Sequence, residues 1–343
     1  MVTTAAQPAP SHRPQALDMP WLRPALQKAL HELQAHALLL SLPPGAGAFE
    51  LALAIAQGWL CQNPQDGFPC GQCRSCHWFA VRSHPDFLGL LPQALEASLG
   101  SQNPETSSAE EKSTQAKSSH EIKVDAVRSA VSFVQTTSSS GRIKVILIHP
   151  AERMNLVASN ALLKTLEEPA GVARFILSCS APQALLPTVR SRCQVLPVPW
   201  PNTEQATTWL AQHSIQQPEV LLAAAGGLPL AARDWAAEGL TAEAWLDIPR
   251  CAIKGEPAAL AAWPISRWVD ALQKLCHDTL CVAVQGAPRF FPPAVVPRGA
   301  SLKALASWGR QLHELARHAD HPWSQPLALA ALLQQARQAL ARS

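Results

Sequence analysis

Short apolar runs alternate with helix-like segments over roughly the first 200 residues. Four runs have the length and composition of buried strands: residues 36–41, 144–149, 174–178 and 194–198. Between them, apolar residues recur at helical spacing over residues 49–60, 124–134 and 151–168, and the last pattern stops at Pro169. Strands that alternate with helices predict a parallel sheet with helices on both faces.

The pattern changes after Trp200 and Pro201, where the strand signals end. Three apolar stripes at helical spacing follow, over residues 265–275, 302–315 and 327–340. Such stripes usually form a core, although one of them could also be a partner surface. We therefore predict one α/β domain followed by two helical pieces.

Residues 95–119 interrupt the α/β pattern with a polar stretch that is rich in Ser, Glu, Lys and Gln. The stretch has almost no large apolar side chains, so burial cannot offset the entropy lost on ordering. We predict a mobile surface insertion.

Composition narrows the class of protein. Of the 343 residues, 48% are hydrophobic and 15% are charged, which is typical of a globular chain. The net charge of +3 is too small to indicate a nucleic-acid-binding surface. No apolar run has the roughly 18 residues that cross a bilayer, and the first residues lack an apolar signal core. A cytoplasmic location and no membrane partner are therefore expected.

Residues 36–57 have the outline of a phosphate-binding loop between a strand and a helix. The intact motif, G-x-x-x-x-G-K-[ST], needs a lysine for the phosphates and a hydroxyl for Mg²⁺. Gly45 and Gly47 fit the turn, but Ala48 and Phe49 stand in place of the lysine and the hydroxyl. Taken alone, this stretch could be an ordinary turn.

A second departure lies at the end of the predicted strand 144–149. An active ATPase needs acidic residues there to hold Mg²⁺ and to poise water. His149 and Pro150 occupy these positions, and Glu152 lies beyond them. The order of strands and helices is that of an ATPase, but the loop and the strand end both lack the side chains that the reaction needs. Together, these two differences indicate an inactivated ATPase.

Four of the nine cysteines lie within residues 61–76: Cys61, Cys70, Cys73 and Cys76. Four thiolates suit a structural tetrahedral zinc ion, and zinc adds about 10–16 kcal/mol in small peptides. An iron–sulfur cluster and metal-free thiols remain alternatives. His77 and His84 could each replace one sulfur, although a surface role fits them better.

Residues 188–193 contain two arginines, Arg190 and Arg192, in the sequence TVRSRC. Arginines in such a turn are often surface charges or salt-bridge partners. The alternative is an arginine finger, which stabilises the charge on the phosphate of a neighbouring subunit's nucleotide.

With these motifs, the chain resembles the delta-prime family of bacterial DNA polymerase III clamp-loader subunits, which are AAA+ proteins. The matching stretches are PWL at 20–22, the four cysteines followed by SHPD at 83–86, VDAVR at 124–128, NALLKTLEEP at 160–169 and SRC at 191–193. They follow the family's order over about residues 20–200.

The resemblance implies three domains: an AAA+ domain over 1–200 with a zinc module at about 61–76 and the insertion at about 95–119, a helical lid over 201–245, and a helical collar over 246–343. It implies that Arg192, in Ser191-Arg192-Cys193, is the trans-acting finger and that the four cysteines bind zinc. A lid-domain arginine of active relatives is missing, because Leu230 stands in its place.

The resemblance further implies a subunit that hydrolyses no ATP itself and is classed with DNA-directed DNA polymerase only as part of the holoenzyme. Its partners would be gamma/tau and delta in a hetero-pentamer, with the sliding clamp and primer–template DNA bound through the complex. Two other hypotheses remain: a weak ATPase in its own right, and a zinc-containing DNA-binding module.

Overall fold

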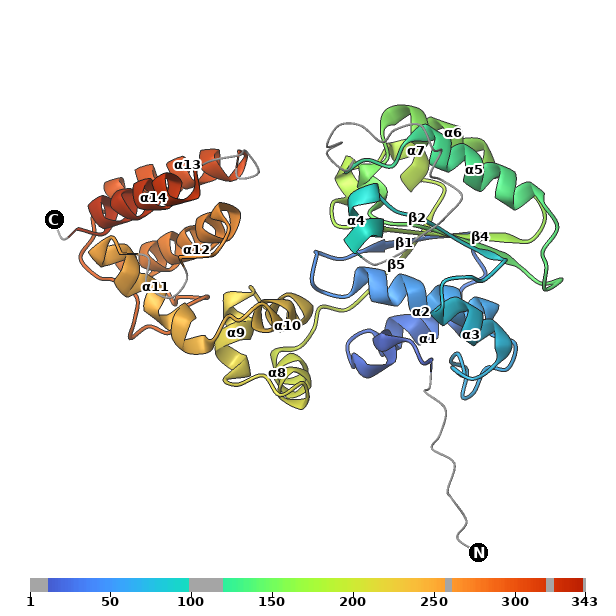
Figure 1. Cartoon of the computed structure of the whole chain (residues 1–343), viewed down its shortest axis with the longest axis horizontal. Coiled ribbons are helices and arrows are strands. Elements are labelled where there is room, and N and C mark those ends of the chain that lie inside the picture. Colours follow the sequence, from blue (N-terminus) through green and yellow to red (C-terminus); the bar gives the residue numbers. More distant parts are fainter. Residues whose placement is uncertain (1–11, 99–119, 257–260, 319–323, 342–343) are drawn as a thin grey trace, which may run out of the picture. The chain divides into compact units, whose positions relative to one another are not determined.

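The computed structural model describes residues 12–98, 120–256, 261–318 and 324–341. The chain forms two compact units, Met1–Trp200 and Pro201–Ser343 (Figure 1).

The first unit contains a parallel sheet, as predicted. Its strands are β1 (Ala37–Ser41), β2 (Phe87–Leu90), β3 (Lys144–Ile148), β4 (Ala173–Cys179) and β5 (Gln194–Leu196). They lie in the order β2-β3-β4-β1-β5, and every neighbouring pair is parallel. The sequence analysis did not predict β2, a four-residue edge strand that contains Gly89.

Helices cover both faces of this sheet (Figure 1). They are α1 (Arg23–His31), α2 (Ala48–Leu60), α3 (Arg74–Ala80), α4 (Gln93–Ser98), α5 (Val124–Gln135), α6 (Leu156–Glu167) and α7 (Pro187–Arg190), with short 3-10 turns at Gln15–Asp18, Ala151–Arg153 and Pro182–Ala184. α2 packs against β3 and β4. On the opposite face, α5 and α6 form a shared apolar core with the sheet through fully buried residues such as Val127 and Leu162.

The continuous helix predicted over 151–168 is wrong in its first part. Ala151–Arg153 is a 3-10 turn, and α6 begins only at Leu156. The cause is Asn155, whose side chain accepts the backbone N–H of Ala158 over 2.9 Å and so caps a new helix.

The predicted insertion over 95–119 can be followed only at its start. Residues 95–98 belong to α4, and residues 99–119 lie outside the described part of the chain. Its predicted mobility therefore stays a prediction.

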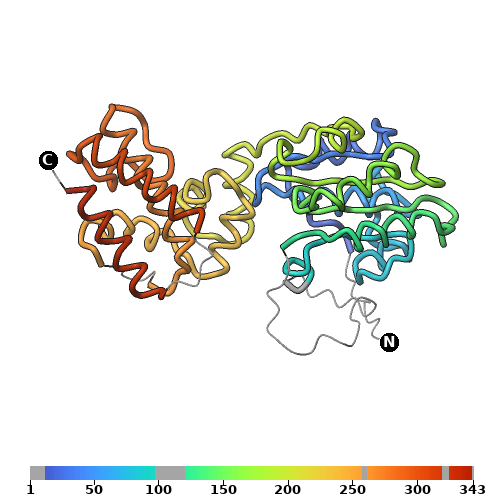
Figure 2. Tube along the Cα trace, turned by 90° about the horizontal axis from the view of Figure 1, so that it is seen from above, coloured from blue at the N-terminus to red at the C-terminus, as the bar shows by residue number. Residues whose placement is uncertain are grey.

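In its described part, the second unit is helical: α8 (Thr203–Gln212), α9 (Pro218–Ala224), α10 (Pro229–Ala237), α11 (Ala242–Lys254), α12 (Ile265–Ala283), α13 (Leu302–Ala316) and α14 (Gln325–Leu340). The three predicted stripes lie on α12, α13 and α14. These helices pack on one another (Figure 2). Their packing buries residues such as Trp268 and Trp308.

A buried carboxylate fixes the loop that follows α12. Asp278, with 0% exposure, accepts the backbone N–H groups of Arg289, Phe290 and Phe291 over 2.7–2.9 Å. Because each bond is charge-assisted, this loop is held firmly against the bundle.

Candidate functional site

The strand–turn–helix frame of a phosphate loop is present at the carboxyl end of β1. Gly45 and Gly47 both have positive φ angles, 85° and 102°, and Gly47 directly precedes α2. The indole N–H of buried Trp21 donates to the Ala46 carbonyl over 2.9 Å, which fixes the turn.

Two rings lie together at the positions where the hydroxyl of the phosphate loop and an acidic residue of an active site would be. The ring of Phe49 lies 4.8 Å from the ring of His149, at 30° between their planes. His149 Nδ1 is 2.6 Å from the hydroxyl of fully buried Ser178, on the next strand of the sheet. The two sequence departures are therefore in contact with each other in space.

The His149 ring carries no charge at neutral pH. Burial lowers the pKa of His149 to about 4, against an opposing effect of Glu152. Glu152 itself accepts the backbone N–H of Ser180 over 2.8 Å. These residues offer a nucleotide phosphate neither the cation nor the metal ligands of a working loop, so they do not fit Mg²⁺–ATP.

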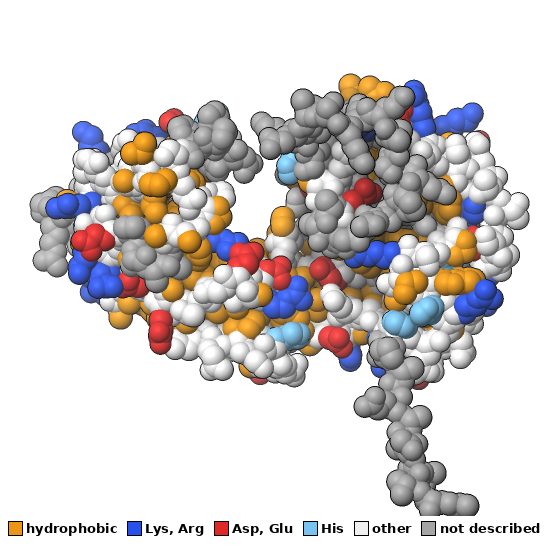
Figure 3. Space-filling model, in the orientation of Figure 1, with side chains coloured by type: hydrophobic (Ala, Val, Ile, Leu, Met, Phe, Trp, Pro, Cys, Tyr) orange, Lys and Arg blue, Asp and Glu red, His pale blue; other side chains and the backbone are white. Residues whose placement is uncertain are grey.

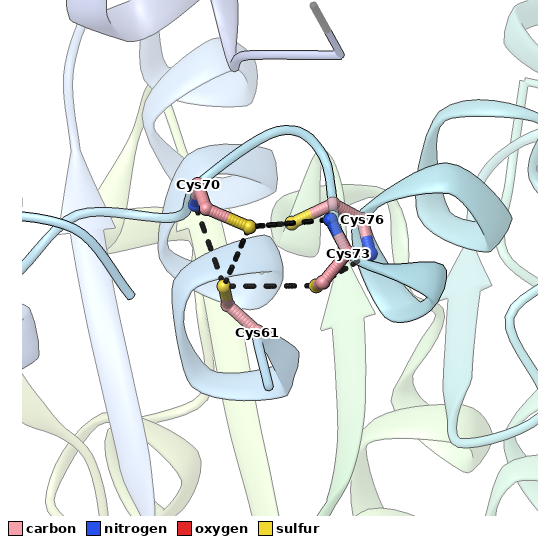
Figure 4. Close-up of side chains that lie close together, drawn as sticks. All are labelled: Cys61, Cys70, Cys73 and Cys76. Carbon is pink, nitrogen blue, oxygen red and sulfur yellow. Dashed lines mark hydrogen bonds between the residues drawn. The ribbon is translucent and has the colours of Figure 1, made fainter. Parts of the chain in front are cut away.

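The four cysteines form one compact cluster (Figure 4). All four sulfurs lie within 4.8 Å of one another, and three of the residues are buried. Cys61 Sγ is 3.7 Å from Cys70 Sγ and 3.9 Å from Cys73 Sγ, and Cys70 Sγ is 4.0 Å from Cys76 Sγ. A tetrahedral ion with Zn–S bonds of 2.3 Å would hold its sulfurs about 3.8 Å apart. The cluster therefore fits a single metal ion.

Backbone N–H groups point at these sulfurs. Gln72 N and Cys73 N lie 3.4 and 3.3 Å from Cys70 Sγ, and Cys76 N lies 3.5 Å from Cys73 Sγ. Burial raises the pKa of Cys61 and of Cys76. Burial also acts to raise the pKa of Cys73, but hydrogen bonds, that of the Cys76 backbone foremost, lower it to about 6. A bound cation would compensate the cost of ionising all four thiols together.

His84 is not a surface residue, which corrects our interpretation of its role. It is 6% exposed, and its Nε2 lies 2.8 Å from the hydroxyl of Ser75 on α3. Its Nδ1 accepts the N–H of Asp86 over 3.0 Å, so Nε2 carries the proton and donates to Ser75. His84 thus links α3, which carries Cys76, to the segment that leads into β2, and both of its ring nitrogens are used in these contacts and not for a metal. His77 is exposed and lies 3.3 Å from His12.

The turn that contains Arg192 lies between α7 and β5. The Arg192 side chain is 31% exposed, and its Nε donates to Glu167 Oε1 over 2.7 Å. Nη2 also donates to Glu167, and Nη1 donates to the Thr188 carbonyl over 2.8 Å. The sequence analysis did not identify Glu167 as the partner, because nothing in the chain spacing relates it to a turn 25 residues later.

The three candidate regions are separate parts of the first unit. Phe49 lies in the first turn of α2 and His149 follows β3. The cysteines lie from the end of α2 to the first turn of α3, and Arg192 precedes the edge strand β5. On the face shown in Figure 3, positive and negative side chains are interspersed. Among the described helices, none is both long and apolar enough to cross a membrane.

Comparison with known proteins gives concordant matches. The family model described as DNA polymerase III, delta subunit, matches residues 22–201. The DNA polymerase III subunit delta' of Pseudomonas aeruginosa is 35% identical over 261 residues, 75% of this chain and 72% of the relative. The subunit delta' of Escherichia coli K12 is 35% identical over 209 residues, 60% of this chain and 56% of the relative.

A solved structure supports the fold. The crystal structure of a DNA polymerase III gamma subunit-related protein from Thermotoga maritima has a TM-score of 0.50 and 16% sequence identity, and covers 94% of this chain and 100% of that chain. At this identity the likeness concerns the fold alone. The family match extends over the first unit, here called the sheet unit, which carries the altered phosphate loop at residues 42–49, the cysteine cluster and Arg192. The chain belongs to the delta-prime family of DNA polymerase III subunits.

Proposed function

We propose that this chain is a clamp-loader subunit that hydrolyses no ATP and completes the ATP site of a neighbouring gamma/tau subunit with Arg192. The observation that carries the proposal is a contrast within the sheet unit. Its own phosphate loop has Ala48 and Phe49 in place of the lysine and the hydroxyl, with the Phe49 ring against His149, whereas Arg192 is partly exposed in an ordered turn.

The chemistry of phosphoryl transfer explains why such an arginine would be retained. Charge spreads over the oxygens of the transferred phosphoryl group, and an arginine finger supplied in trans is worth roughly 10³–10⁵ in rate. The planar guanidinium also matches two phosphate oxygens at once. A subunit without a working site of its own can therefore still be required for hydrolysis next to it.

No catalysis is assigned to this chain itself. As a subunit of the holoenzyme it would be classed with DNA-directed DNA polymerase. Two observations disfavour the alternative of a weak ATPase. Ala48 and Phe49 replace both side chains of the loop that bind Mg²⁺–ATP, and His149 stands at the end of β3 in place of an acidic residue.

We assign a structural zinc ion to Cys61, Cys70, Cys73 and Cys76. The sulfur separations support a single tetrahedral ion, because an iron–sulfur cluster would place several iron and sulfide ions between the thiolates and push them further apart. Such a closed four-sulfur site has no open position for catalysis.

For the helical unit, we propose a lid over residues 201–245 and a collar over 246–343. The long packed helices α12, α13 and α14 suit assembly with equivalent bundles of gamma/tau and delta. The sliding clamp and primer–template DNA would be contacted through the complex, in the cytoplasm. A free-standing DNA-binding role is disfavoured by the small net charge of +3.

Reconstitution tests this proposal. The chain should co-elute with gamma/tau and delta, and its addition should raise the DNA-stimulated ATPase above that of gamma/tau and delta alone. The isolated chain should not bind a fluorescent ATP analogue. Micromolar, Mg²⁺-dependent binding would instead support the weak ATPase, and salt-sensitive DNA binding by the isolated chain would support the DNA-binding module.

A further inference from the structure

The contacts of Arg192 divide its guanidinium into an occupied part and an available part. Nε donates to Glu167 Oε1 over 2.7 Å, and Nη2 donates to the same oxygen. Nη1 lies 2.8 Å from the Thr188 carbonyl and 3.4 Å from Ser191 Oγ. Glu167 therefore takes the side edge of the guanidinium, formed by Nε and Nη2.

At the terminal edge of the guanidinium, one N–H of Nη2 is left available. A guanidinium has five N–H donors, of which Glu167 takes one from Nε and one from Nη2. Ser191 Oγ itself donates to the Thr188 carbonyl over 3.1 Å, so these two acceptors lie together beside Nη1. Nη1 has two acceptors for its two N–H groups, whereas one N–H of Nη2, on the terminal edge, lies outside these contacts and can donate to a phosphate oxygen.

Glu167 lies at the end of a helix that packs in the core, and its own side chain is 48% exposed. Glu167 is the last residue of α6, and the residue before it, Leu166, is fully buried in the core of the sheet unit. An unrestrained arginine loses considerable side-chain entropy when it must hold one geometry. An arginine already fixed at its side edge loses less when its terminal edge meets a ligand.

We infer that Glu167 is a positioning residue for Arg192: it holds the guanidinium so that the terminal edge is presented to the phosphate of a neighbouring subunit's ATP. This inference rests on the proposed function of Arg192. Glu167 does not contact the nucleotide itself, and it acts only through the arginine.

The adjacent residue provides a matched control. Glu168 has the same side chain, is exposed, directly follows Glu167 at the end of α6, and takes no part in the contacts of Arg192. Glu167→Ala and Glu168→Ala therefore remove the same charge from the same helix end, but only the first removes the support of the finger.

The experiment uses the reconstituted complex with gamma/tau, delta and primed DNA. Pre-steady-state ATP hydrolysis is measured, and the phase that Arg192→Ala removes identifies the site in question. Glu167→Ala should slow this phase about tenfold, because small misplacements of a catalytic group are costly. ATP affinity should stay within about twofold, because the finger acts on the transition state more than on binding. Glu168→Ala should match the unchanged protein.

The double variant Glu167→Ala/Arg192→Ala should be no slower than Arg192→Ala alone, since Glu167 acts through the arginine. Equal thermal midpoints of the single variants would exclude a folding defect. If Arg192→Ala removes no phase, the proposed function itself fails. If it does, but Glu167→Ala hydrolyses at the normal rate or faster, or Glu168→Ala is equally slow, only the positioning role is overturned.

Discussion

At the scale of single residues, two side chains that replace the ligands of an active ATP site lie in contact with each other, although they are 100 positions apart in the chain. Phe49 stands where a Mg²⁺-binding hydroxyl would be, and His149 stands at the end of β3. Their rings are 4.8 Å apart, and the hydroxyl of Ser178 lies 2.6 Å from His149. The neutral imidazole is thus partly buried and held by contacts with other parts of the fold.

This buried imidazole predicts a pH dependence of stability. Burial lowers the pKa of folded His149 to about 4 from its ordinary value of 6.5. Between these values the unfolded chain binds a proton that the folded chain does not, so stability falls as the pH drops from 6.5 towards 4. The slope from this group is at most about 1.4 kcal/mol per pH unit. His84, whose pKa burial also lowers, acts in the same direction.

Urea unfolding of the chain at several pH values between 4.5 and 7 checks this expectation. His149→Gln should make the free energy of unfolding less dependent on pH within this window. The same substitution at exposed His120 should leave the dependence as it was. An unchanged slope in His149→Gln would show that the imidazole is not held neutral by burial.

Which residues could be predicted from the sequence depends on how local the signal is. The four cysteines lie close together in the chain, and the structure brings them into one cluster, as predicted. The departures at Ala48, Phe49, His149 and Pro150 were visible because the intact motif is known. Glu167, Ser178 and the buried role of His84 were not predicted, because these contacts depend on how distant segments pack.

At the scale of elements, the long and strongly patterned segments were predicted well. β1, β3, β4 and β5 differ from their predicted bounds by at most two residues at either end, and α12 carries the predicted stripe. β2 was missed because a four-residue run with a central glycine has little periodicity. The start of α6 was misplaced because a side-chain cap at Asn155 overrode a continuous apolar pattern.

The cysteine module yields a prediction on metal content. The purified chain should contain one zinc ion, and Cys73→Ser should lose it and unfold at lower temperature, because a buried four-thiol cluster depends on the ion for its folding energy. Cys281→Ser, at a cysteine of α12 outside the cluster, should retain the zinc. Elemental analysis and a thermal melt measure both effects. Brown colour and bound iron, or full zinc content in Cys73→Ser, would contradict the assignment.

At the scale of the whole molecule, the family match covers residues 22–201, almost all of the sheet unit. The unit contains a phosphate loop that lacks the lysine and the hydroxyl of the intact motif, and an arginine that is partly exposed. The helical unit, Pro201–Ser343, contributes a separate packed core. On our proposal, the sheet unit provides the finger and the helical unit provides the assembly.

The strand signals of the sequence end at residue 200, and the two compact units meet between Trp200 and Pro201. The lid and collar boundaries within the helical unit stay predictions. A helical pattern shows which face of each helix is apolar, but the packing partners of that face in an assembly belong to other chains.

The measurement that tests the central claim most directly is pre-steady-state ATP hydrolysis by the reconstituted complex that contains Arg192→Ala. We expect an intact assembly in which the phase from the adjacent gamma/tau site is lost, since a finger contributes roughly 10³–10⁵ in rate at its site. Arg190→Ala, at an exposed arginine two residues earlier, is the matched control and should hydrolyse normally. A correctly assembled Arg192→Ala complex with every phase of hydrolysis and normal clamp loading would contradict the account.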